Sequence, residues 1–142
     1  MKKIKVAVDV GNSNVVIGLY FNGVWEKIYR LSTKRNFTYW SFQKKLKKII
    51  DLNDFNPSNI ESVIISSVVP TLTDIVKLSC NDMLCENIHI VRASSVKRVN
   101  VSIDNINEIG TDLLSNAVEG SSMYDDNVVV VDFGTALTFT VI

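Results

Sequence analysis

The sequence has one histidine, two cysteines and two prolines among 142 residues, and it carries no net charge. Fifteen basic and fifteen acidic residues cancel, so no overall field favours binding to nucleic acid or to an anionic membrane. No apolar run approaches the ~20 residues of a membrane-spanning helix, and Asp9 comes too early for a secretory signal. These absences predict a cytoplasmic protein that binds neither nucleic acid nor membrane.

The scarce reactive side chains are expected to be structural. Cys80 and Cys85 fall on different faces of a predicted helix, a poor geometry for a disulfide or a metal site, so both are expected to be reduced and partly buried. His89 lies inside the apolar run 88–91, which favours a core or edge histidine over a catalytic one.

The composition is that of a globular chain with a core, since 46% of the residues are hydrophobic and 21% are charged. The length suits one large domain, or one domain and a piece of another. Apolar periodicity and turn residues predict the order β-β-β-α-β-α-β-α-β-β. The predicted helices span 37–52, 70–85 and 108–124, and the first carries Tyr39, Phe42, Leu46 and Ile49 at three- and four-residue spacing.

The remaining segments are predicted as strands and loops. Three strands are expected within 3–31, and Asn22-Gly23 is a strong type I′ hairpin signal. Further strands are expected at 60–69 and 87–92, with a final hairpin in 127–142. The strand at 60–69 has few charges and is expected to be buried on both faces. Loops are expected at 53–59 and 93–107.

This order predicts an α/β fold, a ribonuclease-H-like mixed sheet with helices on its faces. The final hairpin repeats the pattern of the first, which suggests a duplicated architecture with an incomplete second copy. The predicted division is a first domain of residues 1–107 and a partial second domain of residues 108–142.

Two acid-x-Gly turns are the strongest functional signals. One follows the apolar run 4–8 at Asp9, and the other follows the run 128–131 at Asp132. The glycines of the two phosphate-type turns, Gly11 and Gly134, let the backbone bend tightly and come close to a ligand. The hydroxyls and amides of Asn12, Ser13, Asn14, Thr135 and Thr138 can then donate to phosphate oxygens. Asp9 and Asp132 suit a bound Mg²⁺. The alternative is two hairpins with polar turns, and the matching strand context favours phosphate binding.

Five strings in register resemble the N-terminal half of the type III pantothenate kinases, within the acetate and sugar kinase/Hsp70/actin superfamily. These strings are Asp9–Asn14 with Gly18-Leu19, Tyr29–Thr33, Ile64–Pro70, Gly110–Asp112 with Asn116-Ala117, and Val131–Thr138. The resemblance implies phosphorylation of pantothenate by ATP with a divalent metal and a monovalent cation such as K⁺ or NH₄⁺, the first step of coenzyme A synthesis. It also implies dimers with active sites at the subunit interface.

The resemblance assigns Asp112 as the general base and places Gly110 and Thr111 at the substrate. Phosphoryl transfer needs mainly alignment, charge neutralisation and one carboxylate near the attacking oxygen, which Asp112 could supply. The alternative for Asp112 is a carboxylate on the first helical turn, where the helix dipole favours it.

The chain departs from the family pattern in three ways. Leu113 stands where the family usually has an arginine that holds the substrate carboxylate, and Ile103 stands where it has a pocket tyrosine. The family chain also continues well beyond this length. We therefore expect a kinase subunit or fragment that is completed by a second polypeptide or by self-association. A non-catalytic nucleotide sensor and a kinase for another small acceptor remain as alternatives.

Overall fold

The computed structural model describes residues 3–33, 37–97, 99–101, 105 and 109–142. They form two compact units, Met1–Ile90 and Val91–Ile142. The predicted domain division at residue 107 falls inside the second unit and stays a prediction. Within the described ranges, none of the helices has the length and apolar character needed to cross a bilayer.

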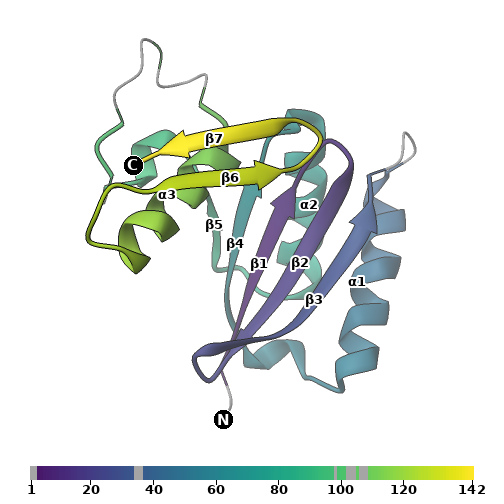
Figure 1. Cartoon of the computed structure of the whole chain (residues 1–142). Coiled ribbons are helices and arrows are strands. Elements are labelled where there is room, and N and C mark those ends of the chain that lie inside the picture. Colours follow the sequence, from purple (N-terminus) through teal and green to yellow (C-terminus); the bar gives the residue numbers. More distant parts are fainter. Residues whose placement is uncertain (1–2, 34–36, 98, 102–104, 106–108) are drawn as a thin grey trace. The chain divides into compact units, whose positions relative to one another are not determined.

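The first unit is a five-stranded mixed sheet with two helices (Figure 1). Its strands are β1 (Ile4–Val10), β2 (Asn14–Phe21), β3 (Val24–Ser32), β4 (Ile60–Ser67) and β5 (Ile88–Ile90), in the sheet order β3-β2-β1-β4-β5. Strands β1, β2 and β3 pair antiparallel, whereas β4 is parallel to both β1 and β5. This is the predicted ribonuclease-H-like arrangement.

The β2–β3 connection is the predicted type I′ turn. Asn22 has φ 50° and Gly23 has φ 86°, so both central residues adopt the left-handed conformation that this turn requires. Asparagine and glycine are the residues that tolerate it best. The local sequence therefore fixes the first hairpin.

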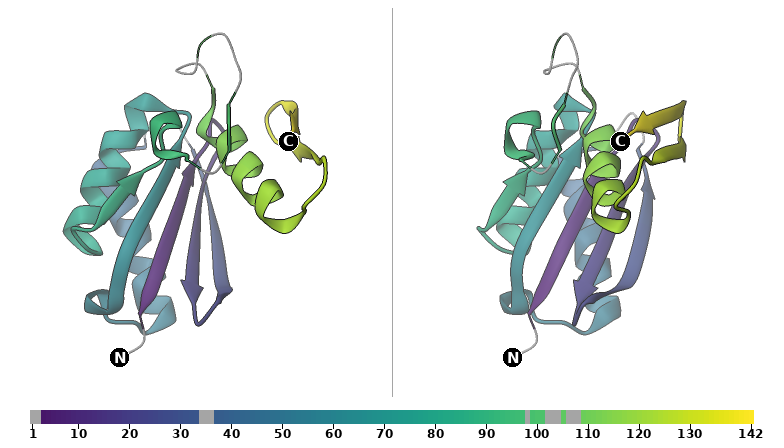
Figure 2. Two further views of the ribbon diagram at one scale, coloured as in Figure 1. Left: turned by 90° about the vertical axis from the view of Figure 1, so that its left-hand side faces the viewer. Right: turned by 60° about the vertical axis from the view of Figure 1, so that its left-hand side comes forward.

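Helices α1 (Tyr39–Asn53) and α2 (Pro70–Met83) cover the same side of the sheet (Figure 2). Helix α1 begins at a capping box in which the Ser41 N–H donates to Thr38 Oγ1. Its buried positions, Phe42, Leu46 and Ile49, have the predicted helical spacing. The neighbouring lysines Lys44, Lys47 and Lys48 are exposed, as a solvated helix face requires.

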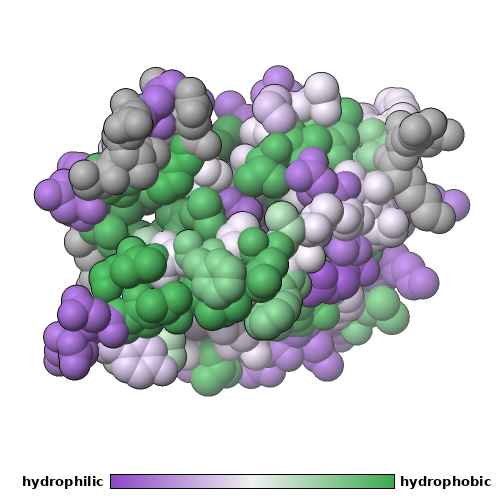
Figure 3. All heavy atoms as spheres, turned by 45° about the horizontal axis from the view of Figure 1, so that its top comes forward, coloured by the Kyte–Doolittle hydropathy of each residue, from purple (hydrophilic) through white to green (hydrophobic). Residues whose placement is uncertain are grey.

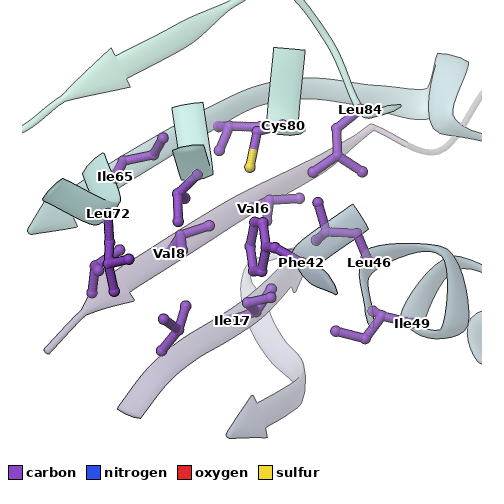
Figure 4. Packing of buried hydrophobic residues seen from close by; sticks show 14 of the residues in the cluster. Val6, Val8, Ile17, Phe42, Leu46, Ile49, Ile65, Leu72, Cys80 and Leu84 are labelled. Atoms are coloured by element: carbon purple, nitrogen blue, oxygen red, sulfur yellow. The ribbon is translucent and has the colours of Figure 1, made fainter. Parts of the chain in front are cut away.

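The core lies between these helices and alternate residues of the strands (Figure 4). Val6 and Val8 of β1, Ile17 of β2 and Ile65 of β4 meet Phe42 there, and all five are nearly or fully buried. Burial of an aliphatic or aromatic side chain of this size contributes roughly 1.5–3 kcal/mol. The shared core therefore holds the helix pair and the sheet together.

The opposite face of this sheet is more open, and here one expectation is wrong. Strand β4 was expected to be buried on both faces, but Ile64 on its second face is 48% exposed. Both helices of this unit lie on the other side, so burial alternates along β4. On the same open face Trp25 of β3 lies over Gly18, where an added Cβ would come within 2.8 Å of the indole ring.

Several predicted boundaries were too generous. The helix expected at 70–85 ends at Met83, and the strand expected at 87–92 is only Ile88–Ile90. The strand expected at 60–69 ends at Ser67, and the loop expected at 53–59 contains the short 3-10 helix η1 (Pro57–Asn59). The ends of helices fray, so the sequence pattern defines their bounds less sharply than it defines their interiors.

The cysteines are free, with Cys80 buried in α2 and Cys85 partly buried just past the end of that helix. Burial raises the pKa of the Cys80 thiol to about 12, with a smaller contribution from Cys85. His89 lies on the edge strand β5 and is exposed, so it is an edge histidine and not a core one.

The second unit contains η2 (Ala93–Ser95), α3 (Thr111–Met123) and a hairpin of β6 (Val129–Phe133) and β7 (Leu137–Val141). Helix α3 was expected to begin at 108, but it begins at Thr111, directly after its N-cap residue Gly110. A Cβ added to Gly120 of α3 would come within 2.5 Å of Ile142 Cδ1. The absence of a side chain at Gly120 therefore lets the helix approach the hairpin closely.

Candidate phosphate-binding turns

The first acid-x-Gly turn joins β1 to β2. Asp9 is the second-last residue of β1 and lies on the open face of the sheet, level with Val16 of β2 and Ser66 of β4. Its side chain is exposed, whereas Val8 and Val10 on either side are buried. The alternation along β1 therefore projects Asp9 away from the core.

The turn itself is tight. The Gly11 N–H donates to the Asn14 carbonyl over 2.9 Å, and an added Cβ at Gly11 would lie only 3.3 Å from that oxygen. Asn12 and Ser13 are exposed at the tip, and Asn14 is partly buried as β2 begins. Polar groups therefore line the tip of a narrow, well-defined turn.

The second acid-x-Gly turn joins β6 to β7. Asp132 and Thr138 are direct cross-strand partners and both are partly buried. Gly134 and Thr135 are exposed, and the Gly134 N–H donates to the Ala136 carbonyl over 3.2 Å. The hairpin thus gathers an acid, a glycine and two hydroxyls at one end.

The third group of candidate residues is at the start of α3. Gly110 is the N-cap residue of this helix, and Thr111 and Asp112 form its first turn. The Leu113 N–H donates to Asp112 Oδ1 over 2.8 Å, and Ser115 Oγ donates to the Thr111 carbonyl. This contact supports the local alternative for Asp112, an acid at a helix N-terminus, and it does not exclude chemistry at the other carboxylate oxygen.

The candidate residues are thus distributed over both units. Asp9 and its turn belong to the first unit, whereas Asp112, Asp132 and the second turn belong to the second unit. The binding of Mg²⁺ by Asp9 and Asp132, expected from the sequence, stays a prediction.

The donor set suits magnesium chemically. Mg²⁺ is commonly held by one or two carboxylates together with phosphate oxygens and waters. Asp9 and Asp132 offer two such carboxylates. Among the described residues, no group of three or more acids, histidines or cysteines is placed to hold a metal by itself.

One residue at the first turn was not assigned a role from the sequence. Thr33 follows β3 and forms two hydrogen bonds with the turn: its N–H donates to the Ser13 carbonyl over 2.8 Å, and its Oγ1 donates to the Gly11 carbonyl over 3.1 Å. Its only sequence signal was its place in the string Tyr29–Thr33.

Ile103, the position where the family pattern has a tyrosine, lies outside the described residues.

One solved structure supports the fold class. YeaZ from Pseudomonas aeruginosa aligns with a TM-score of 0.52 over 94% of this chain and 55% of its own, at 11% identity. A Bacteroides thetaiotaomicron protein with an actin-like ATPase fold and unknown function aligns with a TM-score of 0.48 over 63% of this chain and 32% of its own, at 9% identity. The chain has an α/β fold with the ribonuclease-H-like mixed sheet that the sequence predicts.

Sequence comparison defines the family. The family model for type III pantothenate kinase matches residues 5–142. Type III pantothenate kinases of Listeria welshimeri and Listeria monocytogenes are each 35% identical over 134 residues, 94% of this chain. The chain belongs to the type III pantothenate kinase family. It spans about half the length of these relatives, 52%.

Proposed function

We propose that this chain supplies the phosphate-binding turns and the catalytic base of an ATP-dependent pantothenate kinase. The observation that carries the proposal is the family match over nearly the whole chain together with the two acid-x-Gly turns. The reaction transfers the γ-phosphoryl group of ATP to the pantothenate hydroxyl, the first step of coenzyme A synthesis. We place this reaction in the cytoplasm.

The two turns would orient the phosphates of ATP. The donors that would bind phosphate oxygens belong to Asn12, Ser13, Asn14, Thr135 and Thr138. Gly11 and Gly134, whose N–H groups donate to the carbonyls of Asn14 and Ala136, would let the backbone approach the phosphates closely. Asp9 and Asp132 would hold Mg²⁺, which supplies neutralisation of phosphate charge when bound. Because the chain belongs to this family, we also propose that the reaction requires a monovalent cation, K⁺ or NH₄⁺. These groups align the transferred phosphoryl with its acceptor.

Asp112 would accept the proton of the pantothenate hydroxyl as that oxygen attacks phosphorus. The proton passes to the carboxylate, and ADP leaves with the electrons of the broken P–O bond. Gly110 and Thr111, adjacent to Asp112, would contact the substrate. The helix start therefore couples acceptor binding to proton removal.

We propose that a second polypeptide, corresponding to the unmatched half of the relatives, completes the site. The chain corresponds to about half of each relative, and one face of the β6–β7 hairpin is apolar and exposed. The three cross-strand pairs on that face are Val129–Val141, Val131–Phe139 and Phe133–Leu137. Their side chains are between 42% and 84% exposed.

Apolar residues gather over this hairpin in the space-filling view (Figure 3). A face without charged groups fits another apolar surface, and an uncovered one promotes aggregation. We infer that its occupant is the polypeptide that corresponds to the other half of the relatives' length. Self-association of this chain is the competing outcome.

The test compares three samples: the chain alone, the chain mixed with a polypeptide carrying the unmatched half of the Listeria monocytogenes relative, and a chimera joining the two. Mass in solution and ATP-dependent phosphorylation of pantothenate, with and without K⁺, are measured for each. Activity only in the mixture or the chimera supports completion. A chain that is fully active as a monomer overturns it, and activity of a homo-oligomer supports self-association instead.

The second candidate function is nucleotide sensing without catalysis, and Leu113 is the observation that favours it. Loss of a bidentate arginine removes a charged contact that contributes on the order of 1.5–3 kcal/mol. A kinase for an acceptor without a carboxylate would explain the same substitution. A chimera that binds ATP but phosphorylates neither pantothenate nor other small hydroxyl compounds would support sensing.

A further inference from the structure

The Gly11–Asn14 turn accepts hydrogen bonds from residues outside it, and these residues have no role in the proposed reaction. Strand pairing between β2 and β3 ends at Asn14 and Ser32. Thr33 continues beyond that pair, and both of its hydrogen bonds end on turn carbonyls, those of Gly11 and Ser13. One residue outside the turn thus fixes two of its acceptors.

Two further carbonyls of the same segment are engaged within the first unit. The Val68 N–H, just past β4, donates to the Val10 carbonyl over 3.0 Å. The Gly11 N–H donates to the Asn14 carbonyl over 2.9 Å. Each of these oxygens is oriented toward a donor within its own unit.

This arrangement matters because carbonyl oxygens repel phosphate oxygens, whereas N–H and hydroxyl groups bind them. A turn whose acceptors are tied to its scaffold can present donors to an anion without reorganising when the anion arrives. A turn that is free to flip would lose that preorganisation. The hydroxyl of Thr33 is therefore suited to control phosphate affinity without touching the phosphate.

We propose that Thr33 is a positioning residue that holds the Gly11–Asn14 turn in its phosphate-binding conformation. The proposal rests on the proposed function, because it assumes that this turn receives the nucleotide phosphates. It adds Thr33, the residue that follows β3, to the residues proposed to act on the nucleotide phosphates. The ligand class is the polyphosphate of a nucleotide.

The critical experiment separates the hydroxyl of Thr33 from its backbone. Thr33→Val keeps the shape and the N–H bond to Ser13 and removes only the bond to Gly11. Thr33→Ser keeps the hydroxyl and serves as the rescue variant. Ser32→Ala removes a hydroxyl from the exposed neighbouring position and serves as the matched control.

The first readout is amide hydrogen exchange at residues 11–14, measured on the full chain without nucleotide. Thr33→Val is expected to raise exchange there by about 2- to 13-fold, the change that corresponds to loss of one hydrogen bond of roughly 0.5–1.5 kcal/mol. Thr33→Ser and Ser32→Ala are expected to match the wild type. Equal exchange in Thr33→Val and the wild type would overturn the holding role.

The second readout is the affinity for MgATP of the active chimera. A positioning role predicts that Thr33→Val raises the dissociation constant for MgATP by a similar factor, that Thr33→Ser restores it, and that the pantothenate KM changes little. If wild-type chimera binds no MgATP, the proposed function fails while the exchange result still stands. If wild type binds and Thr33→Val binds equally well, the Thr33 proposal fails and the proposed function survives.

Discussion

Asp132 on β6 lies directly opposite Thr138 on β7, with the exposed Gly134 and Thr135 in the connection between them. An acid that can hold a metal and a hydroxyl that can donate to a phosphate are therefore brought together by one strand pairing. Thr140 lies two residues further along β7, on the same face, and its buried Oγ1 has no partner among the described residues. Of these two threonines, Thr138 is expected to contribute to phosphate binding, whereas Thr140 is not.

Thr138→Val is expected to weaken MgATP binding to the completed enzyme by about 2- to 13-fold, because one hydrogen bond contributes roughly 0.5–1.5 kcal/mol. Thr140→Val is the matched control, from the same residue type on the same strand face. It removes a buried hydroxyl that has no partner, so affinity should be kept and stability should not fall. Calorimetric titration of both variants checks this; equal losses of affinity would contradict the assignment of Thr138.

Asp112→Asn in the active assembly is expected to lower turnover by about 10²–10⁴-fold, because asparagine cannot accept the hydroxyl proton. Binding of MgATP should be nearly unchanged, since the role assigned to Asp112 lies at the acceptor and not at the nucleotide. The measurement is kcat for pantothenate phosphorylation beside an independent ATP dissociation constant. Unchanged turnover would favour nucleotide sensing or another base.

Cys80 should resist alkylation in the native chain, whereas the partly buried Cys85 should react. Burial raises the pKa of the Cys80 thiol from 9.0 to about 12, so little reactive thiolate exists at neutral pH. Mass spectrometry after iodoacetamide treatment should show one modified cysteine, and Cys85→Ser should show none until the chain unfolds. Rapid native modification of Cys80 would refute its burial.

The same pKa shift has a consequence for stability. The folded pKa lies above the unfolded value, so the stabilisation is fully present below pH 9.0 and is lost as pH rises from there to about 12. In Cys80→Ala the free energy of unfolding should fall less between pH 9.0 and about 12 than it does in the wild type. Denaturant unfolding at several pH values across that range measures the difference.

Ser79→Ala should stabilise the first unit by about 0.5–1 kcal/mol, against the usual direction of core substitutions. Ser79 is fully buried on α2, and its Oγ has no partner among the described residues. Alanine removes that hydroxyl and favours the helix. Val76→Ala, on the same helix and equally buried, should instead cost about 2 kcal/mol by leaving a cavity. Urea unfolding measures the change in stability for both variants. Destabilisation by Ser79→Ala would contradict the prediction and indicate that Ser79 Oγ has a hydrogen-bond partner.

Much of the first unit follows from local sequence signals. The Asn22-Gly23 turn, the buried spacing of Phe42, Leu46 and Ile49, and the start of α2 at Pro70 all match, since each depends on neighbours within a few residues. The burial of β4 on both faces was predicted incorrectly. Its low charge indicates an apolar strand, but only the placement of α1 and α2 decides which face is covered.

The sequence by itself determined the type of each main element, the two acid-x-Gly turns and the family, because these depend on residue types and short spacings. The tertiary structure alone showed that Thr33 bonds to Gly11 and Ser13, that Asp132 lies opposite Thr138, and that six apolar side chains share one exposed face of the hairpin. These relationships arise from strand register and from where chain segments meet. A shift of one residue in register would move every side chain of a strand to the other face, so local patterns cannot define them fully.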